Sequence, residues 1–162
     1  MTIPVTFAVP TAEDMHVLGA RLGSACEGGD VIILSGDLGA GKTTIAQGIG
    51  RGLGIDERVT SPTFVIARVH PNPGDRPDLV HVDAYRLGSR AEVDDLDLAS
   101  DLDRSVVVVE WGEGLLEGLS ASRVMVRILR SEDEADEART VEITCPDDRW
   151  SRVVAAIPGG SP

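Results

Sequence analysis

Two short, uninterrupted apolar runs stand out from an otherwise mixed pattern of hydrophobic and polar positions. They are Val31–Leu34, with the sequence VIIL, and the valine run inside Ser105–Glu110, with the sequence SVVVVE. A strand that reads as a continuous apolar run is typical of a parallel sheet, because both of its faces are covered. The pattern therefore predicts two central parallel strands and a fold of the α/β class.

Helical periodicity occurs on both sides of the first run. From Thr11 to Glu27 apolar residues recur at helical spacing, Thr11 and Asp14 form a capping pattern, and a Gly-Gly pair follows. A second helix is predicted over Lys42–Leu53, ending near Gly54. The central strand Val31–Leu34 is thus expected to connect two helices.

Four further segments have the composition or alternation of strands. Thr63–His70 and Leu79–Tyr85 are joined by the loop PNPGDRP, which predicts a hairpin. RVMVRIL and TVEITC, within residues 123–145, flank the acidic segment SEDEADEA and predict a second antiparallel pair with a solvated turn. The tail 158–162 is expected to be disordered, so a single domain is predicted for residues 1–157.

The charge of the chain narrows the possible partners. Its 162 residues carry a formal net charge of −12, with acidic clusters at Glu92–Asp103 and Glu132–Glu137. Such a surface repels phosphate backbones, and the chain has only five aromatic residues for base stacking. Tight direct binding of nucleic acid is therefore not expected.

Location and cysteine chemistry follow from two further features. No apolar run approaches the roughly 20 residues needed to cross a bilayer, and the start lacks the features of a signal peptide, which predicts a cytoplasmic protein. The two cysteines, Cys26 and Cys145, are far apart and show no CxxC spacing. They are expected to be buried or half-buried thiols without a chemical role.

The segment 36–43, GDLGAGKT, carries the chemistry. It matches the phosphate-binding pattern G-x-x-x-x-G-K-[ST] and lies between a predicted buried strand and a predicted helix, which is the context that the motif requires. Its glycines allow successive backbone N–H groups to turn around a phosphate, and the helix start adds its positive end. Lys42 is expected to contact the β and γ phosphates, and the Thr43 hydroxyl to ligate Mg²⁺.

Lys42 is the only lysine in the chain, whereas the other fourteen basic residues are arginines. A general preference for arginine explains the absence of lysine elsewhere. It also suggests why lysine is kept at position 42, because a planar guanidinium is wider and more rigid than an ammonium group. We therefore expect Lys42 to be the basic position where arginine cannot serve.

Two acids end strand-like segments and are candidates for the metal shell. Asp83 follows LVHV, and Glu110 follows SVVVV. A phosphate-binding loop needs a carboxylate at the end of a neighbouring strand, so one acid is expected to hold the metal and the other to position water. The segment Thr60–Phe64, TSPTF, is either a proline turn that enters a strand or a hydroxyl-bearing segment that senses the γ phosphate.

In chain order, the motifs GDLGAGKTT, SPTF, HVDAYRL and VEWGE closely resemble the TsaE family of small bacterial ATPases, also called YjeE. The resemblance extends from about Val9 to Cys145. It implies an α/β, P-loop NTPase-like fold of three layers, with a mixed, mainly parallel sheet and antiparallel edge strands. It also implies ATP and Mg²⁺ as ligands, and a role in the threonylcarbamoyl modification of adenosine 37 in tRNA. There the TsaB and TsaD proteins would be the partners, and tRNA would be reached indirectly through their complex.

The resemblance also implies roles for individual residues. Lys42 would bind the phosphates, Thr43 and Glu110 would hold Mg²⁺, Asp83 would orient water, and Thr63 would read the γ phosphate. Support for the site or the partner contact would come from Tyr85, Arg86 and Trp111. The residues that would contact the nucleotide are Gly36, Asp37, Gly39, Ala40, Gly41, Lys42, Thr43 and Thr44, with Thr11 and Arg139 on the adenine side.

Three positions depart from the family's pattern and bear on the base contacts and on the segment after YRL: Met15, residues 97–99 and Ala138. Three other classes of nucleotide-binding protein could carry the same loop. A GTPase is excluded as far as the base-reading motif N-K-x-D is concerned, because the only asparagine is Asn72 and the only lysine is Lys42. A small-molecule kinase with the same loop is the alternative, although SPTF and VEW have no place in it. A nucleotide-dependent interaction protein is the third hypothesis, and it overlaps with an ATPase that is slow without its partners.

Overall fold

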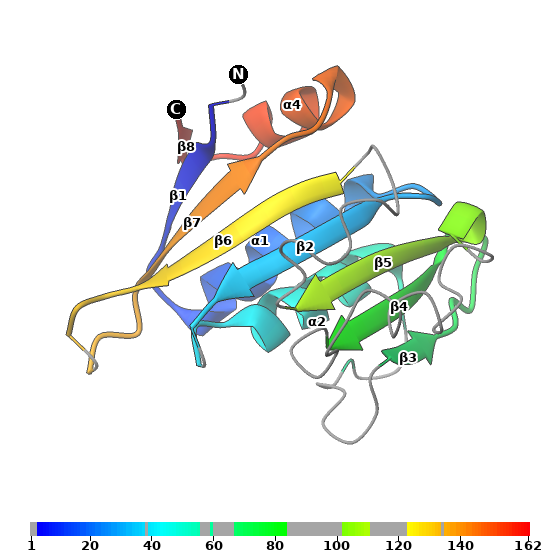
Figure 1. Ribbon diagram of the computed structural model, residues 1–162, viewed down its shortest axis with the longest axis horizontal. Helices are drawn as coiled ribbons and strands as arrows, with labels where there is room; N and C mark the ends of the chain where they lie inside the picture. The colour runs from blue at the N-terminus through cyan, green and yellow to red at the C-terminus, as the bar shows by residue number, and fades with distance from the viewer. Residues whose placement is uncertain are drawn as a thin grey trace, which may run out of the picture.

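The computed structural model describes residues 3–37, 39–55, 59, 67–83, 102–110, 123–133 and 135–162. Within these ranges the chain forms one mixed sheet of eight strands, with helices packed against it (Figure 1). The strands are β1 (Val5–Val9), β2 (Val31–Gly36), β3 (Ala67–His70), β4 (Asp78–Asp83), β5 (Ser105–Glu110), β6 (Arg123–Arg130), β7 (Arg139–Thr144) and β8 (Gly160–Ser161). The helices are α1 (Ala12–Ala25), α2 (Lys42–Leu53), α4 (Asp148–Ala155) and a 3-10 turn at Leu102–Arg104.

The centre of the sheet is parallel. The strand order is β3-β4-β5-β2-β6-β7-β1-β8, and the four strands from β4 to β6 in this order run parallel. Val31–Leu34 are buried throughout, as are all six residues of β5. The prediction of two central strands covered on both faces is therefore confirmed.

Antiparallel strands complete the sheet at both edges. β3 pairs with β4, which confirms the predicted hairpin over its described part, and β6 pairs with β7, which confirms the second predicted pair. β1 then pairs with β7, and β8 with β1. Figure 1 shows the two chain ends close together at this edge, where β1 and β8 meet.

α1 and α2 lie side by side on one face of the sheet, and they approach each other closely because glycines line their contact (Figure 1). A Cβ atom at Gly23 would lie 2.1 Å from the carbonyl oxygen of Ile49, and one at Gly48 would lie 2.3 Å from that of His16. Both distances are far too short for non-bonded atoms, so only glycine permits this spacing of the two backbones. The observed helices confirm the two predicted ones, with Thr11 as the N-cap of α1 and Gly54 as the C-cap of α2.

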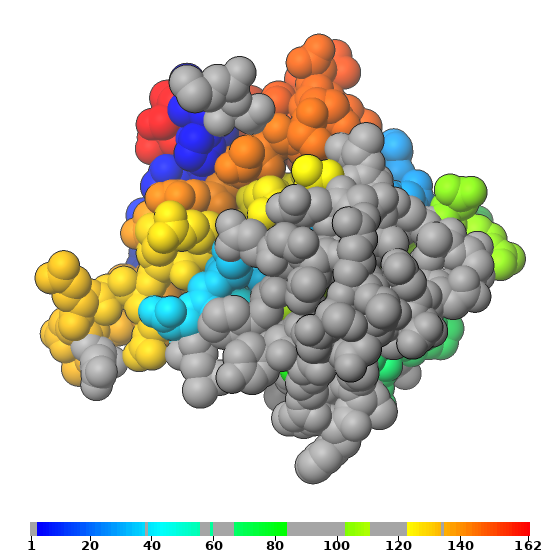
Figure 2. Space-filling model, in the orientation of Figure 1, coloured from blue at the N-terminus to red at the C-terminus, as the bar shows by residue number. Residues whose placement is uncertain are grey.

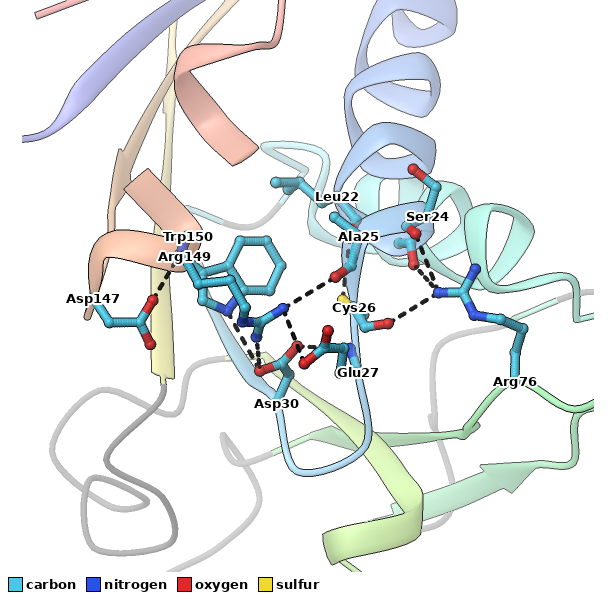
Figure 3. A network of polar contacts seen from close by, with 11 residues as sticks. Leu22, Ser24, Ala25, Cys26, Glu27, Asp30, Arg76, Asp147, Arg149 and Trp150 are labelled. Atoms are coloured by element: carbon cyan, nitrogen blue, oxygen red, sulfur yellow. Dashed lines mark hydrogen bonds and ion pairs between the residues drawn. The ribbon is translucent and has the colours of Figure 1, made fainter. Parts of the chain in front are cut away.

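Figure 3 shows how the third helix, α4, is fixed beside the end of α1. Arg149 and Trp150 of α4 both contact the carboxylate of Asp30, at the start of β2, and Arg149 donates to the carbonyl of Ala25 at 3.2 Å. Trp150 is fully buried and belongs to the core between the sheet and α1. The third layer of the expected fold falls on residues outside the described ranges and stays a prediction.

Three elements were not anticipated from the sequence: β1, α4 and β8. The expectation of a disordered tail at 158–162 is wrong, because Gly160 and Ser161 pair with Phe7 and Thr6 of β1. The tail is rich in glycine and proline, but the free edge of β1 offers backbone groups with which even such a segment can pair. Its order is therefore a product of the sheet rather than of its own composition.

Two minor expectations concern cysteines and membranes. Cys26 and Cys145 are buried free thiols, as predicted, and burial raises the pKa of both. Among the described residues, no helix is both long enough and apolar enough to span a membrane.

Candidate nucleotide-binding site

The predicted phosphate-binding segment is the turn between β2 and α2. It leaves the buried strand at Gly36 and enters the helix at Lys42, while Gly39 and Gly41 have φ angles of 78° and 117°. These values lie in the left-handed region, which glycine adopts readily and residues with side chains avoid. Gly41 is also the N-cap of α2, so no side chain of the cap residue forms a hydrogen bond with the positive end of this helix. In the space-filling view the segment borders β6, to which Gly36 is paired through Ile128 (Figure 2).

The ammonium group of Lys42 lies inside this turn. Its Nζ donates to the carbonyl oxygen of Gly36 at 2.8 Å and to that of Asp37 at 3.0 Å, and the residue is only 6% exposed. Burial lowers the pKa of Lys42, while the carboxylates of Glu110, Asp37 and Asp83 act in the opposite direction. The only lysine of the chain is thus held among backbone carbonyls and acids at the start of α2.

The two predicted acids lie next to each other at the carboxyl ends of parallel strands. Asp83 of β4 and Glu110 of β5 are register partners, so their side chains project from the same face of the sheet. α2 begins on that face, and the Thr43 hydroxyl donates to Oε1 of Glu110 at 3.3 Å. The structure therefore brings Lys42, Thr43, Glu110 and Asp83 together, although they come from three separate segments of the chain.

A fifth polar residue, His81, belongs to this group and was missed by the sequence interpretation. It is fully buried on β4, and its Nε2 lies 3.0 Å from Oε2 of Glu110. The available signal was its spacing, because His81 and Asp83 are two residues apart and therefore share one face of the strand.

A cavity of about 180 Å³ adjoins the turn on the side away from the acids. It is lined by Thr11, Ala12, Met15, Gly39, Ala40, Gly41, Thr44, Glu137 and Arg139. Both residues expected on the adenine side therefore border it. The Thr11 hydroxyl is engaged as the cap of α1, because it accepts from the backbone N–H of Asp14 at 3.1 Å and donates to its carboxylate at 2.8 Å.

Arg139 connects the β6–β7 turn to the phosphate-binding turn. Its Nε donates to the carbonyl of Ala40 at 3.1 Å, and its Nη2 to that of Gly39 at 3.4 Å. Its Nη1 donates to the carbonyls of Asp136 and Ala138. The guanidinium thereby binds the carbonyls of Gly39 and Ala40, whereas Lys42 binds those of Gly36 and Asp37.

Four predicted site residues lie outside the described residues: Thr63, Tyr85, Arg86 and Trp111. Leu38 of the phosphate-binding segment also lies outside them. The remaining predicted residues of the site are all described. They comprise the glycines and Asp37, Ala40, Lys42, Thr43 and Thr44 of the loop and helix start, together with Asp83, Glu110, Thr11 and Arg139.

The donor atoms near Lys42 fit Mg²⁺. They are the hydroxyl of Thr43 and the carboxylates of Glu110 and Asp83, and hard oxygen ligands of this kind are the ones that Mg²⁺ prefers. In the described ranges no group of three or more His, Cys, Asp or Glu side chains is arranged to hold a metal by itself. Mg²⁺ at nucleotide sites commonly takes one or two carboxylates together with phosphate oxygens and water, which the donors near Lys42 can supply in part.

Comparison with known proteins gives consistent results along almost the whole chain. A family model described as "Threonylcarbamoyl adenosine biosynthesis protein TsaE" matches residues 9–141. The tRNA threonylcarbamoyladenosine biosynthesis protein TsaE of Streptomyces coelicolor is 53% identical over 148 residues, which cover 90% of this chain and 100% of that relative. The protein of the same name from Bacillus subtilis is 36% identical over 139 residues, covering 85% of this chain and 84% of its own length.

A solved structure has the same fold. The crystal structure of YdiB from Bacillus subtilis superposes with a TM-score of 0.72 at 32% sequence identity, and the match covers 96% of this chain and 94% of that one. The match agrees with an α/β fold that has a parallel sheet centre and antiparallel edges. By the family model, the relatives and this structure together, the chain belongs to the TsaE family.

Proposed function

We propose that this protein is a Mg²⁺-dependent ATPase that serves the threonylcarbamoyl modification of adenosine 37 in tRNA. The observation that carries the proposal is the meeting of Lys42, Thr43 and Glu110 at the start of α2, where a glycine-rich turn leaves a buried parallel strand. The names of the relatives support the biological role. The cavity beside Arg139 is the space in which the rest of the nucleotide would lie.

Each residue has a defined task in this mechanism. The backbone N–H groups of the turn and the positive end of α2 bind the phosphates, and Lys42 adds a mobile point charge for the β and γ phosphates. Thr43 and Glu110 would hold Mg²⁺, which would supply positive charge to neutralise the phosphates. Asp83 orients the water that attacks the γ phosphate, and Thr63 reads whether that phosphate is present.

The partners are the TsaB and TsaD proteins. A formal charge of −12 disfavours a direct hold on tRNA, so the nucleic acid is expected to contact the partners instead. ATP binding promotes docking on the TsaB–TsaD complex, and hydrolysis resets that complex. P-loop enzymes of this kind are often slow until a partner completes the site, so the isolated chain is expected to turn over slowly.

The test is a measurement of phosphate release from ATP by the full chain, alone and with TsaB and TsaD, in the presence of Mg²⁺. We expect slow release by the chain alone and faster release with both partners. Lys42→Ala protein is expected to be inactive in both conditions. Analysis of the products separates this proposal from the alternative of a small-molecule kinase, which would transfer phosphate to a metabolite instead of water.

Two results would contradict the proposal. Wild-type turnover by Lys42→Ala protein would show that the site lies elsewhere. Tight binding of free tRNA by the isolated chain at physiological salt would contradict the assignment of nucleic-acid contacts to the partners.

A further inference from the structure

His81 is a fully buried histidine on β4, and the positions that precede it and Glu110 on the same face are apolar. On the face of β4 and β5 that α2 covers, the positions before Glu110 are Val106 and Val108, and the one before His81 is Leu79. All three of these neighbours are buried and apolar. Packing alone would be served by another leucine or valine at position 81, so the polar ring requires a different explanation.

Among the described residues the ring makes one hydrogen bond, and that bond is with Glu110. The Nε2 atom lies 3.0 Å from Oε2 of the carboxylate, which can only accept, so the hydrogen of the ring must be on Nε2. The other nitrogen, Nδ1, is buried and has no hydrogen-bond partner within the described part of the chain. An unpartnered buried nitrogen is unfavourable. The ring orientation that places Nε2 next to Glu110 therefore has a cost in stability.

The two oxygens of Glu110 are engaged from two sides. His81 of β4 donates to Oε2, while Thr43 of α2 donates to Oε1. Glu110 is itself 5% exposed, and its backbone is fixed in the centre of the sheet. The bond from the rigid strand β4 leaves Oε1 as the oxygen that faces the hydroxyl expected to bind the metal.

We propose that His81 is a positioning residue that fixes the Glu110 carboxylate for Mg²⁺, so that Oε1 is directed towards Thr43 and the phosphate-binding turn. The inference rests on the proposed function, because it assumes that Glu110 serves a Mg²⁺–nucleotide complex. Partners of this kind orient a ligand carboxylate, and their loss weakens metal affinity without removing a ligand. His81 itself contacts neither nucleotide nor metal.

The experiment compares His81→Leu with His81→Gln in the full chain. Leucine removes the donor and suits the apolar surroundings, whereas glutamine retains an N–H group that can reach the carboxylate. His70→Leu is the matched control, because His70 is also a fully buried strand histidine, two register positions away on β3. Binding of a fluorescent, non-hydrolysable ATP analogue is measured in EDTA and then during titration with Mg²⁺.

We expect His81→Leu to raise the Mg²⁺ concentration at half effect about 10- to 100-fold, as for other partners of metal ligands, while binding in EDTA stays unchanged. His81→Gln is expected to recover most of the loss, and His70→Leu to show the wild-type Mg²⁺ response. A wild-type Mg²⁺ response in folded His81→Leu protein, or an equal defect in His70→Leu, would overturn the assignment. Wild-type protein that binds the analogue without any Mg²⁺ response would overturn the proposed function as well, so the two failures are distinguishable.

A second measurement needs no variant and covers the case in which His81→Leu does not fold. The chain has only three histidines, so ¹⁵N–¹H spectra of their side chains can be assigned. We expect the hydrogen of His81 to be on Nε2, and its signal to move when Mg²⁺ and the ATP analogue are added together. A hydrogen on Nδ1 alone would show that Nε2 does not donate to Glu110 and would overturn the proposal.

Discussion

The two ends of strand β2 both hold buried charged groups, but they use them differently. At its start, the carboxylate of Asp30 is 3% exposed; at its end, the turn beyond Gly36 encloses Lys42, which is 6% exposed. Burial alone therefore does not distinguish a structural cluster from a candidate active site. The difference lies in where the partners of each charge come from.

At the start of β2, the partners of Asp30 come from elements that must be held together. Its Oδ1 accepts from Arg149 and, at 3.4 Å, from Nε1 of Trp150, and its Oδ2 accepts from the backbone N–H of Glu27 at 2.7 Å (Figure 3). Arg76 adds a second clamp nearby, because it donates to the carbonyls of Gly23, Ser24 and Cys26 at the end of α1. This cluster joins α1, β2 and α4, and its evident product is stability.

At the end of β2, the charged groups are gathered around a turn and a helix start that can bind an anion. Lys42 is bonded to carbonyls of its own turn, and burial lowers its pKa against the opposing effect of Glu110, Asp37 and Asp83. Concentrating one ammonium group and several carboxylates here has a cost in stability that phosphates and Mg²⁺ would offset. The comparison indicates that charge at the start of β2 supports the fold, whereas charge at its end would, under the proposed function, support nucleotide binding.

The largest expected effect is on activity, from Lys42→Arg. This change keeps the charge, but the wider guanidinium does not fit the turn, so we expect ATP turnover to fall by roughly 10²-fold or more, as when a preorganised charge stabiliser is lost. Phosphate release under saturating ATP is the measurement.

The thermal midpoint of Lys42→Arg provides the control, and it is expected to stay close to that of the wild type. Turnover at the wild-type rate would mean that the single lysine has no special role, and the contrast between the two ends of β2 would lose its main support.

The next largest effect is on stability, from Asp30→Ala. Removing one partner of a buried ion pair leaves Nη2 of Arg149 and the N–H of Glu27 without the carboxylate that they share, so we expect the free energy of unfolding to fall by about 3 kcal/mol. Urea denaturation gives this value.

Activity per folded molecule is the companion measurement, and it should be unchanged in Asp30→Ala. Trp150→Phe, which removes only one of the donors and part of a buried ring, should cost less, about 1–2 kcal/mol. A variant of Asp30 that stays stable but loses ATP turnover would contradict the division of roles.

The smallest expected effect concerns the titration of Lys42. Because burial lowers the pKa of Lys42 in the folded protein, its side chain should titrate below the ordinary value of 10.5. Between the folded-state pKa and the unfolded-state pKa, the unfolded chain binds more protons, so the free energy of unfolding should rise with pH. The chain has one lysine, so labelled lysine gives a single side-chain NMR signal to follow.

A Glu110→Gln variant sharpens the same titration. Loss of that carboxylate should lower the midpoint further, because its charge favours the protonated amine. A midpoint at or above the value of the urea-unfolded chain would show that burial does not control this amine.

Much of the fold and of the site could be predicted from local patterns. Hydrophobic periodicity predicts the two central strands, the helices α1 and α2, and the two antiparallel pairs. The glycines and Lys42 predict the phosphate-binding loop. The elements that were missed, β1, α4 and β8, depend on contacts between distant parts of the chain. Arg149 and Asp30 are 119 residues apart, and nothing in the segment around either one identifies the other.

The sequence by itself determined the chemistry that is local: a turn with glycines at left-handed positions, one lysine, one threonine, and acids at the ends of apolar runs. Only the tertiary structure decided which acids face the turn and that His81 bonds to Glu110, 29 residues further along the chain. The physical reason is that backbone conformation depends on neighbouring residues, whereas the side of a sheet on which a side chain lies depends on strand order and register. Those are set by the packing of the whole domain.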